Sequence, residues 1–86
     1  MKTIEEAMWT IYINRTEDNY YRYILSTPDE LMATDQDRED ECIMDMIIKG
    51  EHRSNKFETH IELFQSLGTY CFMALGLKYF TVKNKL

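Results

Sequence analysis

Three acidic residues have the spacing of a calcium-binding loop. Asp35, Asp37 and Glu39 stand at its first, third and fifth positions, where oxygen ligands are required. The sixth position is Asp40 instead of the glycine that the sharp turn needs, and the twelfth is Met46 instead of a bidentate glutamate. We therefore expect no calcium site and interpret these carboxylates as part of a solvated helical turn.

The imidazoles and thiols lack the spacing that metal binding or nucleophilic catalysis needs. His52 and His60 have no cysteine or acid at a metal-ligand interval. Cys42 and Cys71 lie inside apolar patterns, so we expect buried, reduced thiols without a disulfide. The sequence predicts a protein that is not an enzyme and holds no metal or cofactor.

Acidic residues are concentrated in one segment. Between Asp29 and Asp45 there are eight carboxylates and one basic residue, Arg38. An acidic helical face is common on soluble domains, but it also suits docking to a basic protein surface or mimicry of nucleic acid in a cationic groove. The predicted partner-binding residues of this run are Asp35, Asp37, Glu41 and Asp45.

An aromatic cluster with a guanidinium follows the first apolar segment. Its members are Tyr20, Tyr21, Arg22 and Tyr23. Such a cluster packs partly into a core, anchors a protein interface or stacks on a nucleotide, and we include all four residues in the predicted partner-binding set.

Size and charge limit the class of protein. The 86 residues fit a single domain, 1–86, and 44% of them are apolar, so a core can form without disulfides or metal. The net charge of −5 disfavours direct binding to nucleic acid or to an anionic membrane. Segment 63–77 is uncharged, but it is shorter than the ~20 apolar residues of a membrane span. Because the N-terminal residues lack a secretory pattern, we expect a cytoplasmic protein.

Three glycines and one proline favour a few long elements, mainly helices. A capping pattern at Thr3 and Glu6 predicts a helix over 4–14. The alternative is a β-hairpin, because apolar residues also alternate over 9–13 and 21–25, although the turn between them has no glycine.

Helical signals dominate the rest of the chain. Proline at position 28, followed by acids, predicts a helix start, and a second cap at Thr34 leaves open whether that helix restarts there. An apolar face then runs to Gly50, and 51–54 is expected to be a connector. From Ser54, apolar residues at three- and four-residue steps predict a long helix over 55–75, followed by a strand-like segment at 77–82.

These elements predict a mainly α-helical fold, a compact bundle of three to four helices around the long apolar C-terminal helix. The alternative is an α+β fold with an N-terminal β-hairpin. Segment 63–77 is apolar all round, so it is covered either by the bundle or by a second copy in a homo-oligomer.

The function is inferred by elimination. We expect a small acidic, non-enzymatic modulator that binds a protein partner and inhibits it by occupying its surface. The short acidic chain, rich in Ile, Tyr, Asn and Met, is similar in composition to accessory proteins of bacterial viruses that block a host factor. The alternatives are a nucleic-acid mimic that binds a basic groove through residues 29–45, and a protein that sequesters a small ligand such as a nucleotide.

Overall fold

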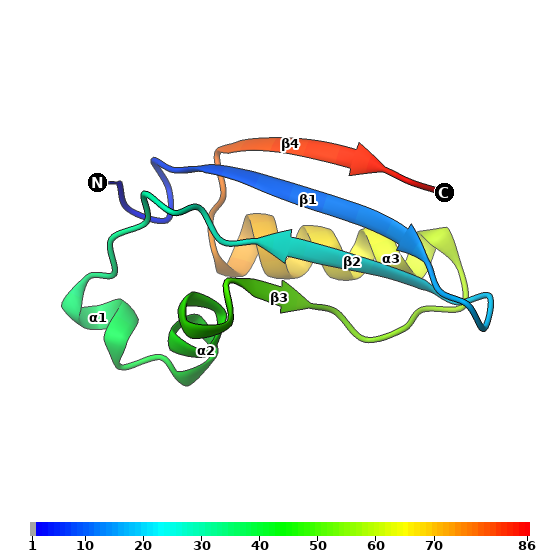
Figure 1. Ribbon diagram of the computed structural model, residues 1–86, viewed down its shortest axis with the longest axis horizontal. Coiled ribbons are helices and arrows are strands. Elements are labelled where there is room, and N and C mark those ends of the chain that lie inside the picture. Colours follow the sequence, from blue (N-terminus) through cyan, green and yellow to red (C-terminus); the bar gives the residue numbers. More distant parts are fainter. Residues whose placement is uncertain (1) are drawn as a thin grey trace.

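The computed structural model describes residues 2–86 and shows an α+β fold (Figure 1). A mixed four-stranded sheet has the strand order β3-β2-β1-β4. The elements of the fold, in chain order, are β1 Met8–Arg15, β2 Tyr21–Ser26, α1 Asp35–Arg38, α2 Glu41–Lys49, β3 Glu51–Arg53, α3 His60–Leu67, the π-helix η1 Gly68–Ala74 and β4 Tyr79–Asn84. The predicted helical bundle is therefore wrong, and the alternative α+β arrangement with an N-terminal hairpin is the one that the structure shows.

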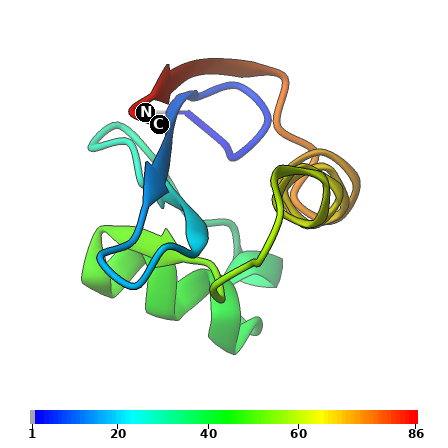
Figure 2. The same ribbon diagram turned by 90° about the vertical axis from the view of Figure 1, so that its right-hand side faces the viewer.

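Helix α3 and its continuation η1 cover one face of the sheet, and the short helices α1 and α2 lie beside the β3 edge (Figure 2). The core lies mainly between the sheet and the helix formed by α3 and η1. It consists of Ile4, Ala7, Trp9, Ile11, Ile13, Tyr23, Leu25, Met46, Leu63, Leu67, Cys71 and Leu77. Within residues 2–86, no helix is both long enough and apolar enough to cross a bilayer.

Strand β1 replaces most of the helix predicted over 4–14. Trp9, Ile11 and Ile13 alternate along it, and their side chains are 0–1% exposed. Aromatic and β-branched residues fit a pleated, half-buried surface, so packing against the rest of the core overrides the local helical signal. Asn19 supplies the turn residue that glycine would otherwise provide, with φ 67° between the two strands.

Two predicted helix starts form only single turns. The Thr3 hydroxyl donates to Glu6 Oε1 at 2.8 Å, so the capping contact exists, but the chain enters β1 at Met8. At the proline turn, the Leu31 N–H donates to the Pro28 carbonyl at 3.1 Å. No helix continues from there, because the backbone next pairs with Lys2 in a short parallel bridge.

The middle of the chain forms α1 and α2. The predicted second cap is present, because the Thr34 hydroxyl accepts from the Asp37 N–H at 3.1 Å and starts α1. Helix α2 ends at Gly50 in the left-handed conformation, φ 77°, which confirms the predicted end. The expected connector over 51–54 contains strand β3.

The helix predicted over 55–75 is shorter in the structure, and about half of it has π geometry. It begins after the N-cap Thr59, and regular α-helix ends at Leu67 before η1 continues to Ala74. Ser54 is no cap, because its Oγ accepts from the Tyr23 N–H at 3.0 Å and so binds strand β2. The predicted strand-like segment at 77–82 is confirmed over 79–82, where it forms the first part of β4, and β4 pairs in parallel with β1.

Candidate functional site

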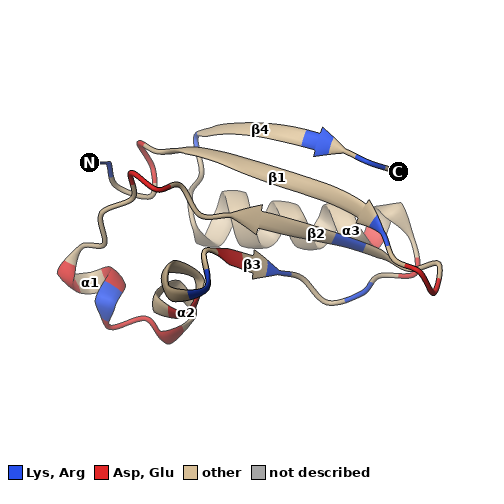
Figure 3. Ribbon diagram, in the orientation of Figure 1, with Lys and Arg blue, Asp and Glu red and all other residues tan. Residues whose placement is uncertain are grey.

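Most of the acidic run lies at one end of the molecule. Red segments mark the N-terminal turn, the turn at 29–30, α1 and α2 at one end of the long axis, which measures 39 Å (Figure 3). The C-terminal lysines, on β4 and beyond it, lie toward the other end. The fold therefore converts an acidic stretch of sequence into an electrically polar molecule.

Two carboxylates of this end have structural roles. Asp37 closes a capping box, because its Oδ2 accepts from the Thr34 N–H at 2.9 Å. Asp40 caps α2, since its Oδ1 accepts from the N–H groups of Cys42 at 2.9 Å and Ile43 at 3.2 Å. The acidity of this segment thus results in part from the need to cap two short helices.

Other carboxylates are not used in this way. Asp35 and Glu41, in the first turns of α1 and α2, are exposed and form no ion pair with any residue in 2–86. Asp45 pairs with Lys49 across one helical turn at 3.1 Å. Because exposed pairs of this kind contribute little, Asp45 remains accessible to a partner.

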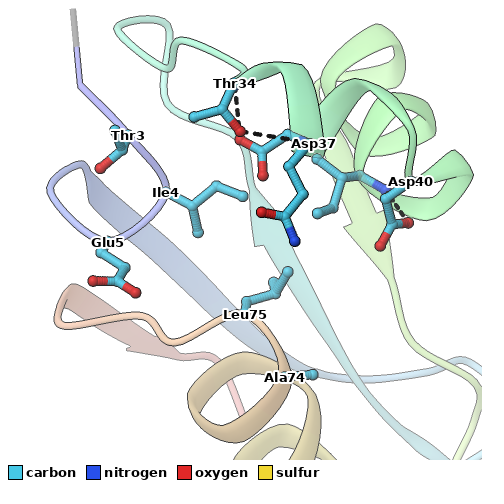
Figure 4. Close-up of a pocket in the computed structure, with 10 residues that line it drawn as sticks. Thr3, Ile4, Glu5, Thr34, Asp37, Asp40, Ala74 and Leu75 are labelled. Atoms are coloured by element: carbon cyan, nitrogen blue, oxygen red, sulfur yellow. Dashed lines mark hydrogen bonds between the residues drawn. The ribbon is translucent and has the colours of Figure 1, made fainter.

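A cleft of about 540 Å³ lies beside these helices (Figure 4). It separates the N-terminal turn and the end of η1 from α1 and the start of α2. The residues that line it are Thr3, Ile4, Glu5, Thr34, Gln36, Asp37, Asp40, Ile43, Ala74 and Leu75. Apolar side chains with carboxylates around them suit a cationic group on an alkyl stem, such as a lysine or arginine side chain.

The sequence does not identify several residues of this cleft. Its local patterns place Ile4 and Glu5 in a helix, and Leu75 in the apolar C-terminal helix. The structure brings them together because Lys2 pairs with Leu31 and anchors the N-terminal turn next to α1. No local pattern in the sequence signals this long-range pairing.

The predicted tyrosine cluster lies at the opposite end of the molecule, where β2 begins beside the hairpin turn (Figure 1). Tyr20 is 37% exposed, whereas Tyr23 is 2% exposed and belongs to the core. Burial raises the pKa of Tyr23. The Tyr21 ring lies 4.2 Å from that of His60, centroid to centroid, and the Arg22 Nε donates to the Ser54 carbonyl at 3.1 Å.

The structure therefore does not bring the two predicted groups of residues into one site. The acidic residues and the tyrosines form separate surfaces at opposite ends of the molecule. Within the aromatic group, Tyr20 offers the most accessible ring, and Tyr23 offers no surface.

The thiols and imidazoles do not form a reactive centre. Burial raises the pKa of Cys71 to about 12, so this thiol stays protonated and unreactive at neutral pH. Cys42 is exposed, which differs from the prediction that both thiols are buried. Burial lowers the pKa of His52, whose ring centroid lies 4.4 Å from that of Tyr70. Across the described chain, 2–86, no three His, Cys, Asp or Glu residues are grouped as metal ligands would be.

Comparison of the chain with protein-family models, with curated proteins and with solved structures finds no match.

Proposed function

We propose that this protein is a small, non-enzymatic modulator that binds a basic surface of a protein partner through its acidic end and inhibits the partner by covering that surface. The observation that carries the proposal is the gathering of exposed carboxylates on α1 and α2, Asp35, Glu41 and Asp45, beside a cleft whose lining is part apolar and part acidic. Two thiols with no disulfide between them favour a reducing compartment, so we place the protein in the cytoplasm.

Electrostatics supports a cationic rather than an anionic ligand. Glu5, Asp37 and Asp40 line the cleft, and the phosphates of a nucleotide would meet these carboxylates at close range. A lysine or arginine side chain would instead place its charge near them and its alkyl stem against Ile4 and Leu75. A basic protein surface therefore fits the cleft better than a nucleotide does.

The test is affinity capture from a bacterial lysate at low and high salt, with the bound proteins identified by mass spectrometry. We expect one partner that is captured at low salt and released as salt rises, because exposed charge pairs are screened. Asp35→Lys combined with Glu41→Lys should abolish capture, since both residues are exposed and neither caps a helix.

A matched control reverses the same number of charges at the other end of the molecule. Glu17 lies in the hairpin turn and Glu58 precedes α3, and both are exposed. Glu17→Lys combined with Glu58→Lys should leave capture unchanged. Equal loss in both double variants would show that only net charge matters and would contradict a specific acidic face.

The same experiment separates the other candidate functions. Displacement of the captured partner by DNA or RNA would identify the acidic end as a nucleic-acid mimic. Capture that survives high salt would move the contact to apolar or aromatic side chains such as Tyr20, which is tested by Tyr20→Ala. If no protein is captured and a nucleotide raises the melting temperature, small-ligand sequestration replaces the proposal.

A further inference from the structure

Strand β4 leaves one long edge of the sheet open. The Lys85 N–H donates to the Ile13 carbonyl at 2.9 Å, and alternate residues of a strand bond to the same neighbour. The backbone groups of Thr81 and Lys83 therefore face β1, whereas those of Phe80 and Val82 point away from the sheet. The opposite edge is only three residues long, β3, and packs beside α2.

The apolar face of the sheet continues onto this edge without being covered. Phe80 and Val82 stand opposite the buried residues Trp9 and Ile11 in the register of β4 with β1, so they share the face that α3 and η1 cover elsewhere. They remain 40% and 44% exposed. The ring of Phe72 on η1 lies 4.8 Å from that of Phe80, centroid to centroid, and is 37% exposed.

We propose that β4 pairs antiparallel with β4 of a second copy of this chain, which joins the two sheets into one of eight strands. Free backbone groups next to a half-exposed apolar row are the features of an edge that accepts another strand. The segment 63–77, from which the sequence predicts self-association, instead directs Leu63, Leu67 and Cys71 into its own core. The contact is therefore assigned to residues 79–84.

Charge favours a second copy in this orientation. β4 runs along the long axis from the acidic end, where Lys78 Nζ lies 3.5 Å from Glu5 Oε2, to the lysine-containing C-terminus (Figure 3). Antiparallel pairing places Lys83 and Lys85 of each copy beside the N-terminal turn of the other, where Glu5 compensates the charge of Lys78. Parallel pairing would instead place Lys83 beside Lys83 and Lys85 beside Lys85, with no carboxylate between them. The acidic helices α1 and α2 lie near the opposite edge of each sheet, so they stay apart in the dimer.

One register satisfies both the hydrogen bonds and the apolar contacts. With the two-fold axis at Thr81, Phe80 of one copy faces Val82 of the other, and both present outward backbone groups. Lys83 then faces Tyr79 of the second copy rather than another lysine. A six-residue strand edge with three apolar side chains is a small interface, below about 1,200 Å², so we expect a micromolar dissociation constant.

Sedimentation equilibrium over low to several hundred micromolar protein tests the proposal. Wild type should pass from monomer to dimer in this range. Val82→Pro should weaken association at least about tenfold, because proline removes an outward N–H but no bond to β1. Arg53→Pro is the matched control, since it places proline in the β3 edge, and it should leave association unchanged. A wild type that stays monomeric, or a dimer unaffected by Val82→Pro, would overturn the proposal.

Disulfide trapping tests the register even if the proline variant is unstable. In a Cys42→Ser background, Thr81→Cys should form an interchain disulfide with oxidised glutathione, because facing residues at the two-fold axis lie within bonding distance. Lys83→Cys should not, since the two copies of residue 83 would be roughly 14 Å apart along the strands. Equal crosslinking of both variants, or crosslinking of Lys83→Cys alone, would overturn this pairing.

Discussion

The cap at Asp40 gives a quantitative test of why acids are concentrated before α2. Its carboxylate accepts two backbone hydrogen bonds, from Cys42 and Ile43. Asp40→Ala leaves both N–H groups without this partner. Loss of an N-cap costs about 1 kcal/mol, and loss of a negative charge near a helix N-terminus adds roughly 0.3–1 kcal/mol. We therefore expect the free energy of unfolding to fall by about 1–2 kcal/mol.

Urea unfolding followed by circular dichroism measures this change. With a slope of roughly 1–3 kcal/mol per molar urea, the urea midpoint should fall by about 0.3–2 M. Glu41→Ala is the matched control, because this adjacent exposed carboxylate lies in the same turn but accepts no backbone N–H bond from residues 2–86. It should lose only the part due to the helix dipole. Equal midpoints for the two variants would refute the capping role of Asp40.

Three further predictions concern buried groups. Ellman's reagent should modify only Cys42 in the folded protein and both thiols in urea, because burial raises the pKa of Cys71 to about 12; rapid modification of both in the native state would contradict its burial. The free energy of unfolding should fall as pH drops below about 6.5, because burial lowers the pKa of His52 and the unfolded chain then binds more protons; urea titrations of His52→Gln should show a smaller fall. The Tyr70 hydroxyl is buried with no hydrogen-bond partner among residues 2–86. Tyr70→Phe should therefore raise the free energy of unfolding by roughly 1 kcal/mol, measured as a higher thermal midpoint. A lower midpoint would show that the hydroxyl has a partner.

The sequence predicts the features whose signals are local. The cap at Thr34 and the helix end at Gly50 can both be predicted, because each depends on backbone geometry within a few residues. The alternation of Trp9, Ile11 and Ile13 also indicates a strand, but the capping pattern at Thr3 competes with it and favours the wrong element. That pattern is satisfied within a single turn, so it carries no information about the conformation of the residues beyond Ala7.

The remaining features depend on contacts that are distant in sequence. Ser54 is as good a helix cap as Thr59, and only the bond from the Tyr23 N–H to its hydroxyl shows that it belongs beside a strand. Likewise, the cleft exists because Lys2 pairs with Leu31, which local propensity does not indicate. The split of the acidic residues between caps and free carboxylates depends on the helix boundaries, so the sequence identifies the charged region but not the role of each member.

The salt dependence of partner binding tests the central proposal most directly. Once the partner is captured, its dissociation constant should be measured by titration calorimetry at several salt concentrations for wild type and for Asp35→Lys combined with Glu41→Lys. We predict that the wild-type constant rises steeply with salt and that the double variant binds weakly at every concentration. A constant that is independent of salt and equal in the two proteins would contradict binding through the acidic end.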